Sequence, residues 1–124
     1  MSRRMSVSMT LDAVRARTKT VTRRHVDSWQ QLKPGDRLTL IEKGMGLPKG
    51  SKQVVVCEVE IIAVEPVNAI ACDPFETERE GLPHMTPGEF CAFWLKGHGY
   101  KATDDPAQVM CRRIEWRYLD EEAS

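Results

Sequence analysis

A short basic segment near the start of the chain, residues 17–24, has side chains that could perform acyl-transfer chemistry. It reads Arg-Thr-Lys-Thr-Val-Thr-Arg-Arg, which sets Lys19 three positions before the hydroxyl of Thr22. Burial can lower the pKa of a lysine to about 7–8, so that its amine acts as a general base. A threonine hydroxyl next to such a base can serve as a nucleophile. The pair therefore suggests hydrolysis through a hydroxyl nucleophile.

The geometry of this segment leaves a second interpretation open. In a regular strand, successive side chains point to opposite faces, so Lys19 and Thr22 would point apart. Lys19 follows a predicted helix, however, and a turn there or the reach of its long side chain could bring the amine to the hydroxyl. If the two groups do not meet, the segment is a solvated basic strand that binds phosphate or no ligand.

The elements that must position these residues begin with short strands and one helix. Alternating apolar and polar residues predict a strand over residues 5–9, and Thr10 can cap a helix over residues 10–17. The β-branched centre of residues 19–24 favours an extended conformation. A Pro-Gly turn at residues 32–36 leads into a strand over residues 37–42.

The second half of the chain carries the clearest signals. Residues 44–50 form a loop, and the Val- and Ile-rich residues 53–64 predict a strand long enough to contain a bend or bulge. A helix should start after Thr86 with a capping box, end near Gly97 and bury the stripe formed by Phe90, Phe93 and Trp94. Residues 114–118 alternate as a half-buried final strand.

These elements predict an α+β fold, a small, partly closed β-barrel of about five or six strands with two or three flanking helices. An open α+β sandwich is the alternative. With 124 residues and 41% hydrophobic residues, the chain should form a single domain over residues 1–124 and is not a disordered protein. We expect residues 1–4 and 120–124 to be flexible ends.

The sequence predicts a cytoplasmic protein without membrane association. No apolar run approaches the roughly 18 residues that a membrane helix needs. The basic start of the chain is not followed by the apolar region of a secretory signal. The four cysteines, at positions 57, 72, 91 and 111, lack metal-binding spacing, so we expect reduced and buried thiols and neither a metal nor a cofactor.

Charge is balanced in total but unevenly distributed along the chain. The 18 basic and 18 acidic residues cancel, yet residues 1–24 contain seven basic residues and one acidic residue, and residues 61–90 contain six acidic residues and one basic residue. A basic segment attracts phosphates and other anions. Alternatively, the acidic segment folds against the basic one and neutralises it.

Four segments, in this order, resemble the ASCH family, whose domains are related to the PUA fold, a small RNA-binding β-barrel. They are residues 19–24, residues 32–36, residues 79–81 before a capped helix, and residues 114–118. The resemblance spans roughly residues 6–119. The family motif, Gly-x-Lys-x-x-Glu-x-Arg, matches Lys19 and Arg24. Arg17 stands where glycine is usual, a departure that bears on the backbone just before Lys19.

Within the family, the sequence is similar to the bacterial N(4)-acetylcytidine amidohydrolases, which have Thr, as at Thr22, where many members have Glu. Their third catalytic residue is a glutamate just before the later helix, and Glu80 matches it best. The resemblance implies that Thr22 attacks the acetyl carbonyl, Lys19 accepts its proton, and Glu80 orients the base or the cytosine amine. Because a nearby carboxylate raises the pKa of a lysine, burial of Lys19 must outweigh Glu80.

Other residues could contact the ligand of such a site. Arg23 or Arg24 could bind phosphate or stabilise an oxyanion. Trp29 could stack on a base or, instead, close the end of the small barrel. His84 lies in a Pro-His-Met loop and could line the rim of the pocket or simply be exposed. Trp94 and Trp116 lie on predicted apolar faces and should belong to the core.

The sequence thus predicts an amidohydrolase, monomeric or weakly dimeric, that removes an acyl group from N(4)-acetylcytidine or a similar modified nucleobase. Two other functions stay open. One is a non-catalytic RNA-binding module, as the relationship to the PUA fold suggests. The other is a metal-independent nuclease of single-stranded RNA, in which Lys19, Arg23 and Arg24 would contact the phosphate.

Overall fold

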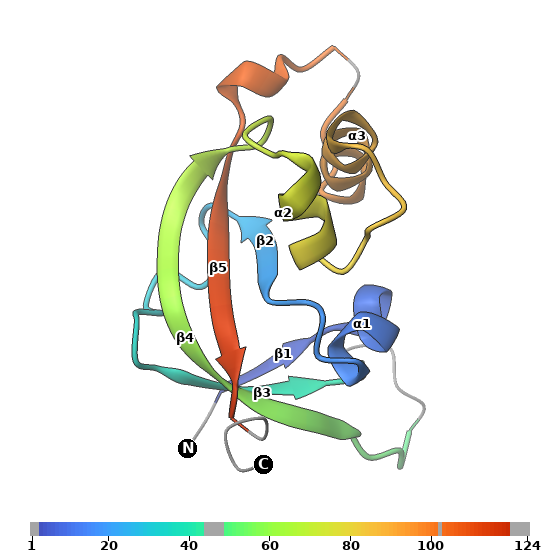
Figure 1. The fold of residues 1–124 in the computed structure, drawn as a ribbon, viewed down its shortest axis with the longest axis vertical. Helices are drawn as coiled ribbons and strands as arrows, with labels where there is room; N and C mark the ends of the chain where they lie inside the picture. Colours follow the sequence, from blue (N-terminus) through green and yellow to red (C-terminus); the bar gives the residue numbers. More distant parts are fainter. Residues whose placement is uncertain (1–2, 44–48, 102, 120–124) are drawn as a thin grey trace.

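One strongly curled sheet forms the frame of the molecule (Figure 1). The computed structural model describes residues 3–43, 49–101 and 103–119. Within them lie the five strands β1 (Arg3–Ser6), β2 (Val21–His25), β3 (Arg37–Ile41), β4 (Val55–Asn68) and β5 (Met110–Tyr118). The sheet order is β1-β3-β4-β5-β2, and β1 pairs with β3 in parallel while the other neighbours are antiparallel.

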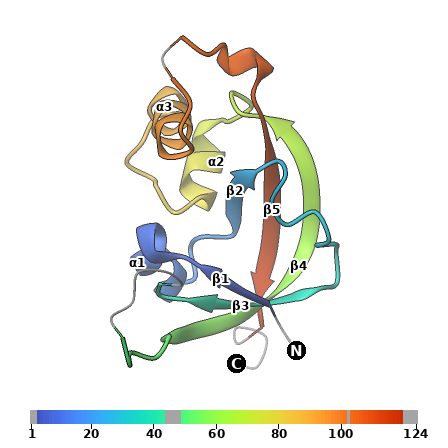
Figure 2. The same cartoon turned by 180° about the vertical axis from the view of Figure 1, so that it is seen from behind.

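Three helices cover the concave side of this sheet (Figures 1 and 2). They are α1 (Leu11–Arg15), α2 (Pro74–Arg79) and α3 (Pro87–Gly97), with short 3₁₀ turns at η1 (Ser8–Thr10) and η2 (Pro106–Gln108). The predicted α+β fold, a small barrel-like sheet with flanking helices, is confirmed by this arrangement within the described residues.

The curvature of the sheet comes largely from β4. This strand pairs with β3 through its first half and with β5 from Val59 onwards, so it belongs to both walls of the curled sheet. Its register with β5 shifts between Ile61 and Ala63. Such a bulge increases the local twist and bends the strand. The bend predicted within residues 53–64 is therefore present.

The apolar interior consists of two clusters. The first packs β1, β3, β4 and β5 together and includes Met5, Leu38, Ile61 and Trp116. The second lies under α3 and includes Phe90, Trp94 and Cys111. The predicted capping box is present, with Thr86 and Glu89 exchanging hydrogen bonds at the start of α3. Residues 114–118 lie in β5, with Ile114, Trp116 and Tyr118 buried.

Several boundaries differ from the sequence-based expectations. The first strand covers Arg3–Ser6, so Arg3 and Arg4 pair with β3 instead of lying in a flexible end. The predicted helix over residues 10–17 is reduced to α1, because Arg17 has a left-handed φ of 63° that a helix cannot continue through. Phe93 is 37% exposed and not buried. Residues 1–2 and 120–124, and most of the loop at 44–50, lie outside the described residues.

The helix α2 was not predicted from the sequence. Its start has a clear local cause, since the Asp73 side chain accepts a hydrogen bond from the Glu76 amide and Pro74 occupies the first turn. Because several of its positions are acidic, α2 lacks a clear apolar stripe, and Thr77 is the only residue of this helix that is buried. Among the described residues, no helix has the length and apolar character needed to cross a bilayer.

Candidate active site

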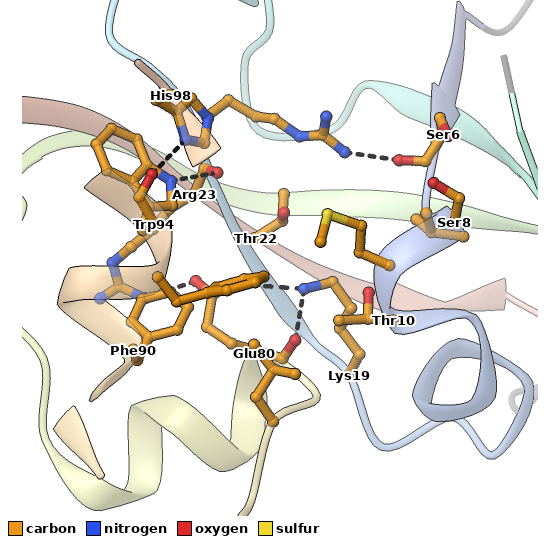
Figure 3. Close-up of a pocket in the computed structure, with 15 residues that line it drawn as sticks. Ser6, Ser8, Thr10, Lys19, Thr22, Arg23, Glu80, Phe90, Trp94 and His98 are labelled. Atoms are coloured by element: carbon orange, nitrogen blue, oxygen red, sulfur yellow. Dashed lines mark hydrogen bonds and ion pairs between the residues drawn. The ribbon is translucent and has the colours of Figure 1, made fainter. Parts of the chain in front are cut away.

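A cavity of about 230 Å³ opens between β2, the chain around η1, and one side of α3 (Figure 3). Its walls differ in chemistry. The side formed by α3 is aromatic, whereas the chain at η1 contributes the hydroxyls of Ser6, Ser8 and Thr10. The floor carries the charged and hydroxyl side chains predicted from the sequence: Lys19, Thr22, Arg23, Arg24 and Glu80.

Lys19 and Glu80 form a buried pair in this cavity. The Lys19 Nζ donates a hydrogen bond to the Glu80 carbonyl oxygen at 2.6 Å and lies 3.4 Å from Glu80 Oε1. Each side chain is 4% exposed. Burial lowers the pKa of Lys19, Glu80 opposes that effect, and the positive charges of Arg24 and Arg23 add to it. The net direction is downward, as a lysine base requires.

Thr22 presents its hydroxyl to the same cavity (Figure 3). The residue is 6% exposed, and its hydroxyl has no hydrogen-bond partner among residues 3–43, 49–101 and 103–119. The alternation of strand faces does not separate it from Lys19, because β2 begins only at Val21. Lys19, Thr22 and Glu80 therefore line one cavity, as the resemblance to the ASCH family implied.

The backbone before β2 is held irregular by specific contacts. Arg17 occupies the left-handed region at the position where glycine was expected. The Lys19 carbonyl accepts hydrogen bonds from the Trp116 Nε1, at 3.1 Å, and from the Tyr118 hydroxyl. The Thr20 amide donates to the Arg79 carbonyl at 2.8 Å. This last bond ties the segment to the end of α2, which directly precedes Glu80.

Gly81 permits this close approach of α2 to α1. Its φ is +88°, and an added Cβ would lie 2.8 Å from the Ala13 Cβ and 3.3 Å from the Lys19 Cβ. Neither neighbour is the mobile end of a long side chain. Gly81 thus allows the backbone carbonyl of Glu80 to reach Lys19.

Gly81→Ala is expected to lower the free energy of unfolding by about 2–4 kcal/mol, because strain at a positive φ adds to overpacking. Urea denaturation followed by tryptophan fluorescence measures the effect. The matched control is Gly88→Ala in α3, where an added Cβ meets no atom within 4 Å and should raise stability by up to about 1 kcal/mol. Similar destabilisation by both substitutions would contradict the explanation.

Arg23 is engaged by the protein itself. Its Nη1 donates to Glu80 Oε2 at 2.6 Å, and its Nη2 donates to Glu76 Oε2 at 2.8 Å and to the Ala71 carbonyl at 3.1 Å. Burial would lower the pKa of Arg23, but the two carboxylates outweigh it and raise that pKa. Although the Arg23 Nε has no hydrogen-bond partner among the described residues, the two carboxylates already compensate its charge. This pairing does not favour the phosphate-binding role predicted for Arg23; its charge supports Glu80.

Arg24 is the cationic side chain that stays available. Its Nη2 donates to the Ser6 carbonyl at 2.7 Å, and its buried Nε has no hydrogen-bond partner among the described residues. No carboxylate in that part of the chain forms an ion pair with it. Burial lowers the pKa of Arg24, with Glu80 acting in the opposite direction. Of the two predicted binding arginines, Arg24 is the one suited to an anion or an oxyanion.

Trp94 is buried in the second apolar cluster, as predicted, but its ring also lines the cavity, and His98 was given no role from the sequence. The His98 ring stacks on Trp94 with centroids 4.0 Å apart, and the Trp94 Nε1 donates to the Arg23 carbonyl at 3.0 Å. Phe93 lies at the exposed side of this wall. The spacing of Phe90, Trp94 and His98 by four positions was the available signal, since such residues share one side of a helix.

Trp29 and His84 do not line the cavity. Trp29 is half-buried against the first apolar cluster, and the guanidinium of Arg3 lies 5.0 Å from its ring centroid. This position agrees with the alternative that Trp29 closes the end of the barrel. His84 is exposed in the turn between α2 and α3. Neither residue is retained in the candidate site.

The cysteines lie outside the lining of the cavity. All four are free; Cys57 and Cys111 are buried, but Cys72 and Cys91 are partly exposed, so the expectation of general burial was half right. Burial raises the pKa of Cys111 to about 11, which makes its thiol unreactive near neutral pH. No group of three or more His, Cys, Asp or Glu side chains within the described residues could hold a metal ion.

The comparisons with known proteins support the fold. No protein-family model matches the sequence, and no curated protein matches it significantly. Among solved structures, the chain is similar to protein EF3133 from Enterococcus faecalis V583, which is assigned to the DUF984 family model. The TM-score is 0.68 at 13% sequence identity, over 96% of this chain and 80% of that one. At this identity the similarity concerns the fold alone.

Proposed function

We propose that this protein is an ASCH-type domain that recognises a modified nucleobase and hydrolyses an acyl amide on it, with N(4)-acetylcytidine as the best candidate substrate. One observation carries the proposal: the buried Lys19 amine, with its lowered pKa, lines the same cavity as the Thr22 hydroxyl, which has no hydrogen-bond partner in the described part of the chain. A base and a nucleophile that share one site are the minimum that acyl transfer requires.

In the proposed reaction, the Thr22 hydroxyl oxygen attacks the acetyl carbonyl carbon and its proton passes to the neutral Lys19 amine. The C–N bond then breaks, and the departing cytosine amine takes the proton back from Lys19. Water then attacks the acetyl ester on Thr22 while Lys19 accepts its proton; the bond from the acetyl carbon to the Thr22 oxygen breaks, and that oxygen takes the proton back from Lys19 as acetic acid is released. Glu80 holds the Lys19 amine through its carbonyl and carboxylate oxygens. The sum is one amide and one water converted to one amine and one carboxylic acid.

The walls of the cavity suit a single planar ring. Phe93, which is 37% exposed, offers an aromatic surface on which a base could stack, next to the stacked rings of Trp94 and His98. The volume, about 230 Å³, lies below the roughly 300–1,000 Å³ of pockets for drug-sized ligands. One base with a small acyl group is therefore favoured over a stack of several bases. The guanidinium of Arg24 would stabilise the negative charge that develops on the carbonyl oxygen.

The direct test is incubation of the full-length protein with N(4)-acetylcytidine, with cytidine and acetate measured by chromatography. We expect conversion by the wild type and a loss of about 10³-fold in kcat for Lys19→Met, since general bases contribute about 10²–10⁴-fold. The rate should rise as pH increases through the pKa of Lys19, because only the free amine accepts a proton. Since burial lowers that pKa, the rise should come below the value of about 10.4 for an ordinary lysine.

The control for Lys19→Met is Lys96→Met, which removes an exposed lysine of α3 that does not line the cavity and should leave kcat unchanged. Absence of conversion by folded wild-type protein, at enzyme concentrations near that of the substrate, would exclude the proposed activity.

A non-catalytic nucleobase-binding module is the second candidate. It is favoured by Arg24, a cavity cation without a carboxylate partner among the described residues, which would attract the phosphate of a nucleotide or of single-stranded RNA. The same experiment separates the two functions. Saturable binding of the nucleoside without any conversion would favour the binding module.

A further inference from the structure

We infer that Glu76 and Arg113 are positioning residues, which act through Arg23 to hold the Glu80 carboxylate next to Lys19. Neither Glu76 nor Arg113 lines the cavity. The effect on turnover rests on the proposed function, whereas the effect on Lys19 itself does not.

The basis is a chain of five alternating charges that runs from β5 through α2 to the cavity. Arg113 contacts Glu76 through two hydrogen bonds, from Nε to Oε2 at 2.9 Å and from Nη2 to Oε1 at 2.8 Å. Glu76 Oε2 also accepts from Arg23 at 2.8 Å, and Arg23 donates to Glu80 Oε2 at 2.6 Å. The other oxygen of the Glu80 carboxylate lies 3.4 Å from the Lys19 Nζ.

The pairing of β2 with β5 places two arginines side by side, and Glu76 compensates their charges. Arg23 and Arg113 are directly opposite each other in the β2–β5 pairing, and like charges in such cross-strand pairs destabilise a sheet. Glu76 Oε2 accepts hydrogen bonds from both guanidinium groups and so bridges them. Because Arg23 is held from this side, its Nη1 points to Glu80.

The Glu76 carboxylate is charged at every pH near neutrality. Hydrogen bonds from Arg113 and Arg23 lower its pKa to about 2, although burial opposes them. Arg79 adds a third cation at 3.2 Å from Oε1. Arg113 has further acidic neighbours, with Glu115 at 3.0 Å and Glu65 at 3.9 Å. Removal of Arg113 would leave Glu76 paired with the buried Arg23 and with the more exposed Arg79.

The two ends of the chain should act on Lys19 with opposite signs. The charged groups that act on the Lys19 amine are Glu80, Arg24 and Arg23. When Glu76 loses its charge, Glu80 is the one carboxylate among the described residues that still pairs with Arg23. Arg23 then draws the Glu80 carboxylate away from Lys19, and its positive charge acts on the Lys19 amine with less compensation. Both changes favour the neutral amine. Loss of Arg113 lets Glu76 neutralise Arg23 more fully, which favours the ammonium form.

The test follows the ¹³Cε chemical shift of Lys19 during a pH titration of full-length protein labelled with ¹³C-lysine, with Lys19→Arg used for assignment. We expect the titration midpoint to fall by about one pH unit in Glu76→Gln and to rise in Arg113→Met. The control is Glu60→Gln, which removes the ion pair of Glu60 with Arg117 at 2.8 Å, away from the cavity, and should leave the midpoint unchanged. In the wild type and in Glu76→Gln, the rise of kcat with pH should follow the same midpoints.

Opposite shifts in the two variants cannot come from general damage to the fold, which would move both in one direction. An unchanged midpoint in folded Glu76→Gln, or shifts of the same sign in both variants, would overturn the inference. If Glu76→Gln does not fold, Arg113→Met tests the inference by itself, and an unchanged or lowered midpoint in that variant is the contradicting result. Absence of amidohydrolase activity in the wild type would remove the proposed function but leave this titration test intact.

Discussion

Thr22→Ala should lower the kcat for hydrolysis of N(4)-acetylcytidine by about 10⁴-fold, the scale of the loss when a catalytic nucleophile is removed. The substitution deletes the only group proposed to attack the acyl carbon. It leaves the aromatic wall and Arg24 in place, so affinity for the nucleoside should stay close to that of the wild type. Steady-state kinetics together with calorimetric titration of cytidine measure the two quantities separately.

Two variants make the Thr22 experiment specific. Thr22→Ser keeps a hydroxyl at the same position and should retain measurable turnover. Thr20→Ala removes a threonine two positions earlier, which does not line the cavity, and should have little effect on kcat. If Thr22→Ala hydrolyses the substrate at a rate near that of the wild type, the nucleophile is not Thr22, and a water activated by Lys19 would take its place in the mechanism.

The second large effect concerns stability. Glu80→Ala should lower the free energy of unfolding at neutral pH by about 3–5 kcal/mol, the cost of breaking a buried ion pair by removing one partner. The carboxylate contacts both Lys19 and Arg23, whose side chains are 4% and 2% exposed, so its loss leaves two buried cations without one of their acceptors. Urea denaturation, monitored by fluorescence and circular dichroism, gives the difference.

Glu78→Ala is the matched control for Glu80→Ala. Glu78 lies two positions earlier on α2 and is exposed, so its substitution should change stability by less than about 0.5 kcal/mol. Equal effects at the two positions would show that Glu80 is neither buried nor paired with Lys19 in solution.

Much of the fold followed from local chemistry. The capping box at Thr86 and the alternation of residues 114–118 are short-range signals, which depend on a few neighbouring residues, and both elements are present. The bulge in β4 was predicted from the length of its apolar run alone. The helix α2 was not predicted, because it buries only Thr77 and owes its position to polar contacts with the sheet.

The site was predicted in its parts but not in its organisation. Lys19 and Thr22 stood out by residue type, and Glu80 by a resemblance to a family motif. Trp94 belongs to the core, as predicted, but its second position, in the wall of the cavity, was not predicted, because the apolar side of a helix has the same periodicity whether it faces packed side chains or a cavity. Arg23 and Arg24 are adjacent in sequence and alike in chemistry, yet within the described part of the chain only Arg23 forms ion pairs with carboxylates.

The residues of the sequence were enough to determine the kinds of groups present and the local elements that carry them, since capping, turns and alternation act over a few positions. Only the tertiary structure decided which charges are paired. Glu76 and Glu80 lie more than fifty positions from Arg23, and the pairing depends on how α2 docks on β2. Burial, which sets the direction of the pKa of Lys19, likewise exists only when distant segments pack around it.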